Sequence, residues 1–480
     1  MKHLITTILL GITSYTFAQT KPQEQINRAV YNRLEFFINS QLTDSAYNLA
    51  SDSFKTQYNL PRFTQMLEEI YPLGRVKSSD ILSFEKGLAT YRMDFDSQSY
   101  EVKFAADSTL KFSTLHFSPM DTAVAEQPLI AEKTEALVTS KAMDKDDFLI
   151  DSIANSYLKQ ANTQSLAIGV VKNGQVKTYF YGETAQGNQT TPTNTSIYEV
   201  GSLSKVFTAI LLSNLVEQGT ITLDQPIALF LPDTLKKNED LSKITFKMLA
   251  NHTSGFPGLP DNLEKTNAYS PNDPYKSYDK KMLYNYLSGF KNKKVPGEEY
   301  EYSDLGYAIL GDIISDIYKK PYDQAVREII CKPLDMNNTF EVLDPKKKDT
   351  LKVYNKDGQE VTPLSYHIFS SASGLKSTLE DLLKFTSAQF KMPQTALENA
   401  MANTRLFTFF LPPDTDIGLA WHMNLLDDLT IYWHNGRTAG SSSYLALSPD
   451  KKSAVVVLSN SALPVDEKGK MILDHLLHAK

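Results

Sequence analysis

The stretch EVGSLSK, residues 199–205, is the most informative part of the sequence. An apolar run with helical period begins there. Ser202 and Lys205 stand three residues apart in it, and side chains at i and i+3 lie on one face of a helix. A serine hydroxyl is a poor nucleophile at neutral pH and needs a base within reach. We therefore predict that Ser202 is a nucleophile and that Lys205 is its proton acceptor.

Context selects this serine, since the Ser-x-x-Lys spacing recurs at seven other serines, with Ser373 the nearest rival. Gly201 permits a tight entry into the helix, and a buried stripe follows, so Ser202 is expected at a helix N-terminus that faces a core. There the helix dipole favours negative charge on the serine oxygen, and partial burial lowers the cost of a neutral Lys205. The alternative interpretation of Ser202 is an N-cap serine.

The chain opens like a secretory signal peptide, which we place at residues 1–18. Lys2 and His3 precede an apolar run, 4–12, and the segment ends at Ala18, before Gln19. That run is too short to span a bilayer, and no later stretch reaches 18 uninterrupted apolar residues. We expect an exported protein, periplasmic or extracellular, with no stable membrane span.

Composition and charge argue against several function classes. A net charge of -7 and a pI near 5.7, without a basic stripe, disfavour nucleic acid as a partner. The single Cys331 excludes an internal disulfide framework. The eight histidines show no metal-ligand spacing, so we expect neither a metal nor another cofactor.

Residues 20–118 predict a small α+β module, because helical patterns precede alternating strands. It resembles exported modules of the cystatin or nuclear-transport-factor type, and we expect a packing or recognition module that contacts a partner or the catalytic domain. Residues 119–140 lose periodicity and are expected to form a linker. The expected helices are 26–39, 43–53 and 61–70, and the expected strands are 80–86, 88–96, 99–105 and 109–117.

Residues 141–480 predict a second domain, in which a helical insertion splits an antiparallel sheet. Asn173 and Gly174 join two alternating runs, which is the strongest short signal for a hairpin. A loop-rich helical region, 223–361, then separates these strands from the later ones. We expect an α+β fold with α/β character, a sheet flanked by helices, and a site in a cleft between sheet and insertion. The expected strands are 165–172, 175–182, 417–423, 430–434, 442–448 and 453–459, and the expected helices include 146–158, 378–390 and 466–477.

Four motifs in this second domain carry a resemblance to a known family. They are YEVGSLSKVFTA at 198–209, LANHTSG at 249–255, PGEEYEYSDLGY at 296–307 and HNG at 434–436. In this order they resemble the serine β-lactamase-like hydrolase superfamily, which includes class C β-lactamases, D-alanyl-D-alanine carboxypeptidases, and esterase and D-aminopeptidase relatives. Ser-x-x-Lys with a Lys-Thr-Gly-type element is also the pattern of β-lactamases and penicillin-binding proteins.

The resemblance implies a role for each matched residue. Ser202 would attack the carbonyl, while Lys205 and Tyr302 exchange the proton as base and acid, giving an acyl-enzyme that is later hydrolysed. The backbone N–H groups of Ser202 and Arg437 would form the oxyanion hole. His252 would be structural, holding a loop. The substrate-binding set it implies is Asp304, His434, Asn435, Gly436 and Arg437.

Two of these positions depart from the antibiotic-cleaving relatives. Asp304 stands where an asparagine usually offers an amide, and a carboxylate beside Lys205 favours the charged amine. His434 stands where a lysine usually meets a substrate carboxylate. One hypothesis is that Arg437 replaces this lysine as the anion anchor, because its fork binds carboxylates bidentately. The alternative is a solvated arginine at a strand edge.

Two function classes follow from the sequence. The favoured one is an exported serine hydrolase that acts on ester, amide or D-amino-acid peptide bonds of a small molecule or peptide, rather than an efficient β-lactamase. The alternative is a catalytically weak, penicillin-binding-like receptor or binding protein. Covalent labelling of the serine would separate them, because only an activated serine gains an adduct.

Overall fold

The computed structural model describes most of the chain, and its contacts divide the chain into two compact units, Met1–Leu129 and Ile130–Lys480. The predicted leader, 1–18, lies outside the described residues, as does the predicted linker from residue 121 onward. The described residues are 20–39, 41–76, 78–95, 98–120, 144–160, 162–266, 268–342, 351–412, 414–426 and 428–478.

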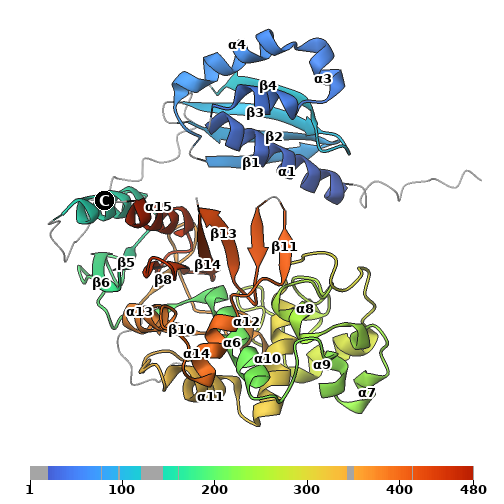
Figure 1. Ribbon diagram of the computed structural model, residues 1–480, viewed down its shortest axis with the longest axis vertical. Coiled ribbons are helices and arrows are strands. Elements are labelled where there is room, and N and C mark those ends of the chain that lie inside the picture. The colour runs from blue at the N-terminus through green and yellow to red at the C-terminus, as the bar shows by residue number, and fades with distance from the viewer. Residues whose placement is uncertain are drawn as a thin grey trace, which may run out of the picture. The chain divides into compact units, whose positions relative to one another are not determined.

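The first unit is a four-stranded antiparallel sheet in sequential order, with α1 lying across one face (Figure 1). Alternating residues of the strands, such as Tyr91 with Met93 and Val102 with Phe104, are buried in its core, as the period of two predicts. The elements are α1 (Thr20–Asn39), α2 (Thr43–Asn48), α3 (Asp52–Gln57), α4 (Leu60–Ile70), β1 (Ser78–Glu85), β2 (Leu88–Asp94), β3 (Ser99–Ala106) and β4 (Phe112–Pro119).

The single helix expected over 43–53 is wrong, because the chain breaks between α2 and α3. Ala50 forms a parallel bridge to Phe112 of β4, and the Ser51 N–H donates to the Phe112 carbonyl at 2.9 Å. The Ser51 hydroxyl then caps α3 by accepting from the Phe54 N–H. A contact with a strand some sixty residues away in sequence thus overrides a continuous helical pattern. The likeness of this unit to cystatin or nuclear-transport-factor modules stays a prediction.

The second unit is built on an eight-stranded antiparallel sheet in the order β11-β12-β13-β14-β15-β16-β5-β6. β5 pairs with β16, so strands from the two ends of the unit's sequence close one sheet. Asn173 and Gly174 have φ values of 52° and 81° in the β5–β6 turn, as a tight hairpin requires. The strands are β5 (Ser165–Lys172), β6 (Gln175–Gly182), β11 (Phe409–Leu411), β12 (Thr415–Ile417), β13 (His422–Leu426), β14 (Leu429–Arg437), β15 (Ser442–Ser448) and β16 (Ser453–Ser459).

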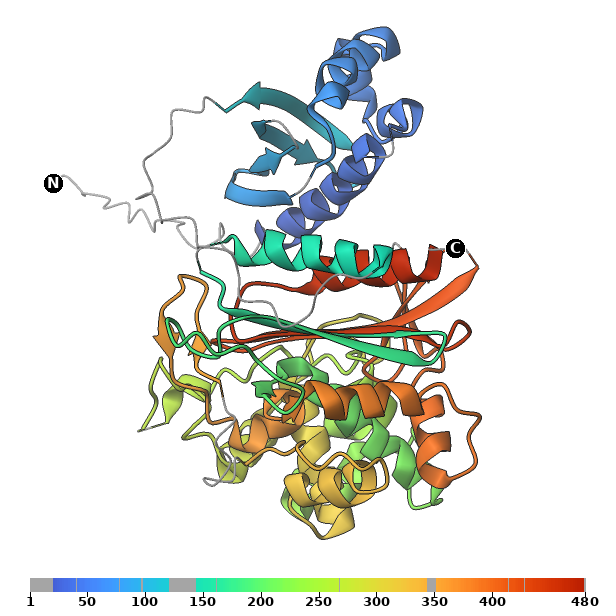
Figure 2. The same cartoon turned by 90° about the vertical axis from the view of Figure 1, so that its left-hand side faces the viewer.

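Both faces of this sheet are covered, because every residue of β15 and β16 is buried. Val455 and Val457 pack against α5 (Lys145–Leu158) and α15 (Asp466–His478), whereas Val456 and Leu458 face the helical insertion. Figure 2 shows α5 and α15 side by side on one face and the insertion on the other. A sheet covered on both faces has continuous apolar strands rather than alternating ones.

The helical insertion carries the segments that form the candidate site. α6 is buried over almost its whole length and packs against α10, α12 and α14. Among the described residues, no helix is both long and apolar enough to cross a membrane. The helices are α6 (Ser204–Glu217), α7 (Asp233–Lys236), α8 (Phe246–Ala250), α9 (Lys280–Gly289), α10 (Asp304–Tyr318), α11 (Tyr322–Ala325), α12 (Ser370–Ser373), α13 (Leu379–Ala388) and α14 (Ala396–Asn403), and short strand pairs are formed by β7 (Ile197–Glu199) with β10 (Lys376–Thr378) and β8 (Val353–Tyr354) with β9 (Glu360–Val361).

The expected strand over 417–423 is also wrong, since a tight turn divides it into β12 and β13. Ala420 takes a φ of 67° and its N–H donates to the Ala250 carbonyl at 3.0 Å, while the Gly418 N–H donates to the Trp421 carbonyl. The alternating apolar pattern is the same in both arrangements, so it does not reveal the turn.

Candidate active site

The predicted nucleophile segment leaves β7 and enters α6 through a short 3-10 turn, Gly201–Leu203. Gly201 has a φ of 52°, and a Cβ added there would come within 2.7 Å of the Arg437 backbone nitrogen. Glycine is therefore required by both the backbone conformation and the close approach of β14. Neither the turn nor α6 has a side-chain cap, so the N-cap interpretation of Ser202 is wrong.

Lys205 lies in the first turn of α6 with its side chain completely buried. Its Nζ donates to Ser202 Oγ at 3.0 Å, to Asp304 Oδ1 at 2.6 Å and to the Ala372 carbonyl at 3.0 Å. These three acceptors match the three donors of an ammonium group. Burial lowers the pKa of Lys205, but attraction to the Asp304 carboxylate and to the Tyr302 phenol outweighs burial and raises it.

Asp304 and Tyr302 reach Lys205 from the start of α10. Ser303 caps this helix by accepting from the Gly306 N–H, which leaves Asp304 at the first helical position, where the dipole stabilises a carboxylate. The Tyr302 ring lies 4.7 Å from Lys205 Nζ, and Tyr302 is 37% exposed. The lysine is thus buried, while the tyrosine beside it is partly exposed to solvent.

His252 holds the segment that carries Tyr302. Its Nδ1 accepts from the Ser303 N–H at 3.0 Å, its carbonyl accepts from the Glu301 N–H at 2.8 Å, and its ring centroid lies 4.4 Å from that of Tyr302. Burial lowers its pKa well below the usual range, and Lys205 lowers it further, so the ring is neutral. A neutral, buried ring that fixes two backbone groups agrees with the structural role expected for His252.

His434 and Gly436 extend from β14 toward the nucleophile. A Cβ on Gly436 would collide with the Val200 carbonyl and lie 3.0 Å from the Ser202 nitrogen, so β14 passes directly against the nucleophile turn. His434 has no exposed surface, and its Nδ1 contacts the Asn435 carbonyl at 2.6 Å. Burial lowers the pKa of His434 well below 6.5, with the charge of Lys205 a lesser cause. A neutral ring cannot replace the charge of a lysine.

Asn435 and Arg437 turn to the opposite face of β14, because side chains alternate along a strand. The Asn435 amide donates to Asp466 of α15, and the Arg437 guanidinium lies 3.3 Å from the other oxygen of the same carboxylate. Arg437 is 54% exposed. These contacts fit the alternative interpretation, an arginine at a strand edge, and give no support to an anion anchor; only the Arg437 backbone adjoins the nucleophile turn.

Sequence reasoning missed the contribution of α12. Besides the Ala372 carbonyl, this helix brings Ser373 Oγ to 3.5 Å from Ser202 Oγ. The sequence raised Ser373 only as a rival nucleophile, and no motif signals that its helix packs on α6. The single available signal was the repeated Ser-x-x-Lys spacing itself.

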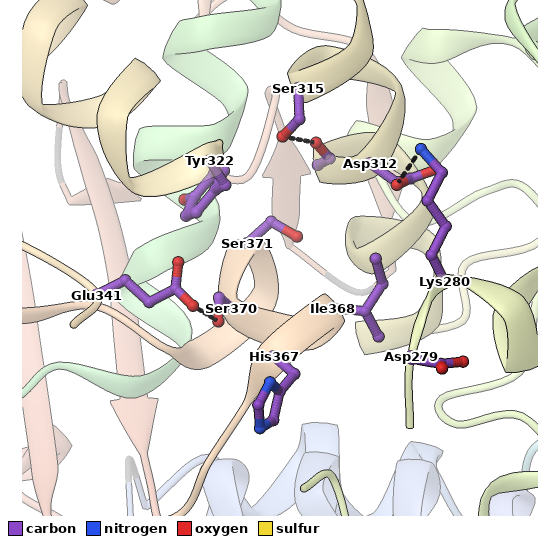
Figure 3. Close-up of a pocket in the computed structure, with 11 residues that line it drawn as sticks. Asp279, Lys280, Asp312, Ser315, Tyr322, Glu341, His367, Ile368, Ser370 and Ser371 are labelled. Carbon is purple, nitrogen blue, oxygen red and sulfur yellow. Dashed lines mark hydrogen bonds and ion pairs between the residues drawn. The ribbon is translucent and has the colours of Figure 1, made fainter. Parts of the chain in front are cut away.

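The other side of α12 borders a separate cavity of about 310 Å³. Figure 3 shows Ser370 and Ser371 of α12 among its lining residues, with Ser370 bound to Glu341 and Lys280 bound to Asp312. Asp279 of the same lining caps α9 by accepting from the Met282 N–H. The hydrogen bonds and ion pairs of these charged residues therefore lead to neighbours other than Ser202 and Lys205 in the described residues. Across those same residues, no group of three or more histidine, cysteine or acidic side chains is placed to hold a metal ion.

Comparison with known proteins agrees with this arrangement. The model of the family described as Beta-lactamase matches residues 150–479. A beta-lactamase from Providencia stuartii is 26% identical over 66% of this chain and 88% of its own length. A D-alanyl-D-alanine-carboxypeptidase/endopeptidase, AmpH of Escherichia coli K12, is 26% identical over 66% of this chain and 84% of its own.

Solved structures show the same fold. A beta-lactamase/D-alanine carboxypeptidase from Pseudomonas syringae superposes with a TM-score of 0.63 at 23% identity, covering 70% of this chain and 100% of that one. A class C beta-lactamase mutant superposes with a TM-score of 0.62 over 70% of this chain and 98% of its own, at 21% identity. Because the family match extends over well more than half of the residues, the chain belongs to the Beta-lactamase family and is a serine hydrolase.

Proposed function

We propose that the chain hydrolyses ester, amide or D-amino-acid peptide bonds of a small molecule or peptide through an acyl-enzyme on Ser202. The observation that supports this most directly is the 3.0 Å contact between Ser202 Oγ and the Nζ of the buried Lys205. A nucleophile and its base within hydrogen-bond reach, with the base oriented by a third group, is the signature of covalent catalysis. Here Asp304 and the Ala372 carbonyl orient Lys205.

In this proposal the hydroxyl proton of Ser202 passes to the neutral form of Lys205 while Oγ bonds to the substrate carbonyl carbon. Tyr302, at the exposed edge of the site, delivers a proton to the leaving group. Water then attacks the acyl carbon and gives a proton to the Tyr302 phenolate, while Lys205 returns its proton to Ser202 Oγ as the acid leaves. The backbone N–H groups of Ser202 and Arg437 stabilise the oxyanion, and such donors each contribute about 3–4 kcal/mol in comparable sites. The close approach of the nucleophile turn to β14 supports this pairing of donors, because a Cβ on Gly201 would lie 2.7 Å from the Arg437 nitrogen and one on Gly436 would lie 3.0 Å from the Ser202 nitrogen.

Covalent labelling tests the proposal. A fluorophosphonate should add once to the protein, and peptide mass spectrometry should place the adduct on Ser202. Ser202→Ala should lose the adduct and the turnover of small esters while keeping its helical content, because the substitution removes one partly exposed hydroxyl. An adduct on another serine, or turnover that survives in Ser202→Ala, would refute the assignment.

One observation favours a second candidate, a binding protein with little turnover. The 2.6 Å ion pair with Asp304 keeps Lys205 charged, and a charged lysine cannot accept a proton. In that case Ser202 would acylate slowly and keep its adduct. Multiple turnovers per protein molecule on any ester or amide would exclude this candidate, whereas slow acylation that stops at one adduct per protein molecule would favour it.

We also infer that the protein is exported after removal of residues 1–18, and that residues 20–118 form a separate module joined by a linker at 119–140. The basic and apolar start of the sequence supports export. The N-terminal sequence of the mature protein, recovered from the extracytoplasmic fraction of its cell, tests both the export and the cleavage position. An intact Met1 in a cytosolic fraction would contradict it.

A further inference from the structure

Glu199 is a buried acid that stands three residues before Ser202 and has no part in the proposed proton transfers. It ends β7, is 6% exposed, and its Oε2 accepts from the Thr438 hydroxyl at 2.8 Å. Its Oε1 is buried without a hydrogen-bond partner in the part of the chain that the structure describes. Burial raises the pKa of this carboxyl. A carboxyl group buried in this way costs stability, which points to a role other than stabilising the fold.

Thr438 connects this carboxyl to the turn that joins β14 to β15. Its N–H donates to the Ser441 carbonyl at 3.0 Å, and its hydroxyl oxygen accepts from the N–H groups of Gly440 at 3.2 Å and Ser441 at 3.0 Å. The single hydroxyl hydrogen is donated to Glu199. Thr438 directly follows Arg437, whose N–H is one of the two proposed oxyanion donors. Glu199 therefore holds the end of the strand that carries this donor.

The backbone of Glu199 belongs to the segment that carries the other donor. β7 leads into the turn that contains Ser202, and it pairs with β10 rather than with β14. Side-chain hydrogen bonds join this segment to the large sheet in the described residues. One runs from Thr438 to Glu199, and the other from the Ser443 hydroxyl to the Val200 carbonyl at 2.8 Å. Of these two, the Glu199 bond reaches the residue next to Arg437.

An oxyanion hole needs its two N–H groups at a fixed separation. The close packing at Gly201 and Gly436 prevents the nucleophile turn and β14 from moving closer together. Steric contact does not prevent them from moving apart, whereas a hydrogen-bonded bridge does. Oxyanion donors act because they are positioned before the reaction, and a displacement of about 1 Å can cost about a hundredfold in rate.

We propose that Glu199 is a positioning residue whose side chain clamps the turn 438–441 to the nucleophile segment and so sets the separation between the N–H groups of Ser202 and Arg437. The inference rests on the proposed function, since it concerns the oxyanion hole of the same acyl-enzyme. Glu199 acts through its neighbours on both sides, through the backbone toward Ser202 and through Thr438 toward Arg437.

Kinetics on one neutral ester tests this clamp. Glu199→Ala should lower kcat and kcat/KM by a similar factor, about tenfold to a hundredfold, because the oxyanion contact strengthens in the transition state. Thr438→Val should have the same effect from the other side of the bridge. The double variant should lose no more than the worse single variant, since both changes remove one interaction. Glu199→Gln keeps an acceptor for the Thr438 hydroxyl and should stay within about threefold of the wild type.

The carbonyl stretch of the acyl-enzyme separates positioning from a general loss of stability. Hydrogen bonds to the acyl oxygen lower its frequency, which infrared difference spectra measure on a slowly released, isotope-labelled acyl group. The frequency should rise in Glu199→Ala and in Thr438→Val. Asp381 is the matched control, because it is 1% exposed, its Oδ2 accepts from the Thr339 hydroxyl at 2.9 Å, and its Oδ1 is buried without a partner among the described residues. Asp381→Ala should lower stability but keep the wild-type kcat and carbonyl frequency.

A wild-type carbonyl frequency in folded Glu199→Ala would overturn the inference, even if turnover fell. Losses that multiply in the double variant would also overturn it, and so would a Glu199→Gln variant as impaired as Glu199→Ala. If Glu199→Ala does not fold, Thr438→Val decides the question by the same two measurements. Failure of a fluorophosphonate to label Ser202 in the wild type would instead remove the proposed function, and the inference with it.

Discussion

Two segments of the chain share the Ser-x-x-Lys spacing and meet in space, yet only one of them forms a serine–lysine pair. Ser202 and Ser373 have their hydroxyl oxygens 3.5 Å apart. Lys205 returns to Ser202 at 3.0 Å, whereas Lys376 extends away and donates to the Glu341 carbonyl at 3.2 Å.

The difference lies in the backbone between serine and lysine. From Ser202 the chain continues as helix, so the lysine three residues later lies on the same face as the serine. Ser373 ends α12, Gly374 follows, and Lys376 begins β10, where it pairs with Glu199 of β7. The spacing predicts a catalytic pair only where the helix is continuous, and the surroundings of the two lysines should respond differently to substitution.

The largest contrast is expected between the two lysines themselves. Lys205→Met should lower kcat/KM by about 10²–10⁴, the range that a general base contributes. Lys376→Met should change it by no more than about threefold, because its ammonium contacts a backbone carbonyl away from Ser202. Steady-state kinetics on one neutral ester gives both values, and equal losses in the two variants would erase the distinction.

Stability separates a lost base from a damaged fold. Lys205→Met leaves Asp304 without its cation, so its free energy of unfolding should fall, although the partial exposure of Asp304 moderates the loss. The double variant Lys205→Met/Asp304→Asn should recover stability without recovering activity. Urea denaturation midpoints measure the stability, and steady-state kinetics measures the activity. Recovery of activity in the double variant would mean that Lys205 is not the base.

The next contrast concerns pH, because Asp304 raises the pKa of Lys205. Turnover of a neutral ester should rise through alkaline pH as Lys205 loses its proton, and Asp304→Asn should move this limb down by about one pH unit or more. Stability should change with pH in the opposite direction to turnover, decreasing where turnover increases. A raised lysine pKa stabilises the fold below the unfolded value of 10.5, and this contribution is lost as pH rises above it. An unmoved limb in Asp304→Asn would contradict the coupling.

The charge of Lys205 helps to lower the pKa values of two buried histidines, an effect that Lys376 does not have. These neutral histidines should make the stability of the fold depend on acid pH. His252 and His434 have pKa values well below 6.5, so the unfolded chain binds protons that the folded chain does not. The free energy of unfolding should therefore decrease as pH falls below 6.5, by up to about 1.4 kcal/mol per pH unit for each ring. His434→Gln should reduce this slope, and the exposed His367 provides the control, since His367→Gln should leave it unchanged.

Much of this arrangement follows from the sequence for a physical reason. The hairpin at Asn173 and Gly174, the paired strands at the C-terminal end and the position of Ser202 before a buried helix all depend on local turn chemistry and periodicity. The eight-stranded antiparallel sheet, with helices on both faces, agrees with the expected fold class.

The parts that could not be predicted depend on distant contacts. Arg437 reaches Asp466 of α15 because its side chain lies on the α15 face of β14. The sequence around the HNG motif does not indicate which face that is. The Ala372 carbonyl that accepts from Lys205 is a backbone atom, so no residue type at that position would signal it. The turn at Ala420 depends likewise on a hydrogen bond to the Ala250 carbonyl, far away in sequence.

The smallest expected effect belongs to Ser373. Its hydroxyl is close to Ser202, but at 3.5 Å the contact is at the limit of a hydrogen bond, and Lys205 provides the shorter partner. Ser373→Ala should therefore lower kcat/KM by no more than about threefold and leave fluorophosphonate labelling on Ser202. Ser373→Cys keeps a weak donor at the same place and should lie between alanine and the wild type. If Ser373→Ala instead abolished labelling, the two Ser-x-x-Lys segments would have to be assigned the other way round, with Ser202 as the supporting hydroxyl.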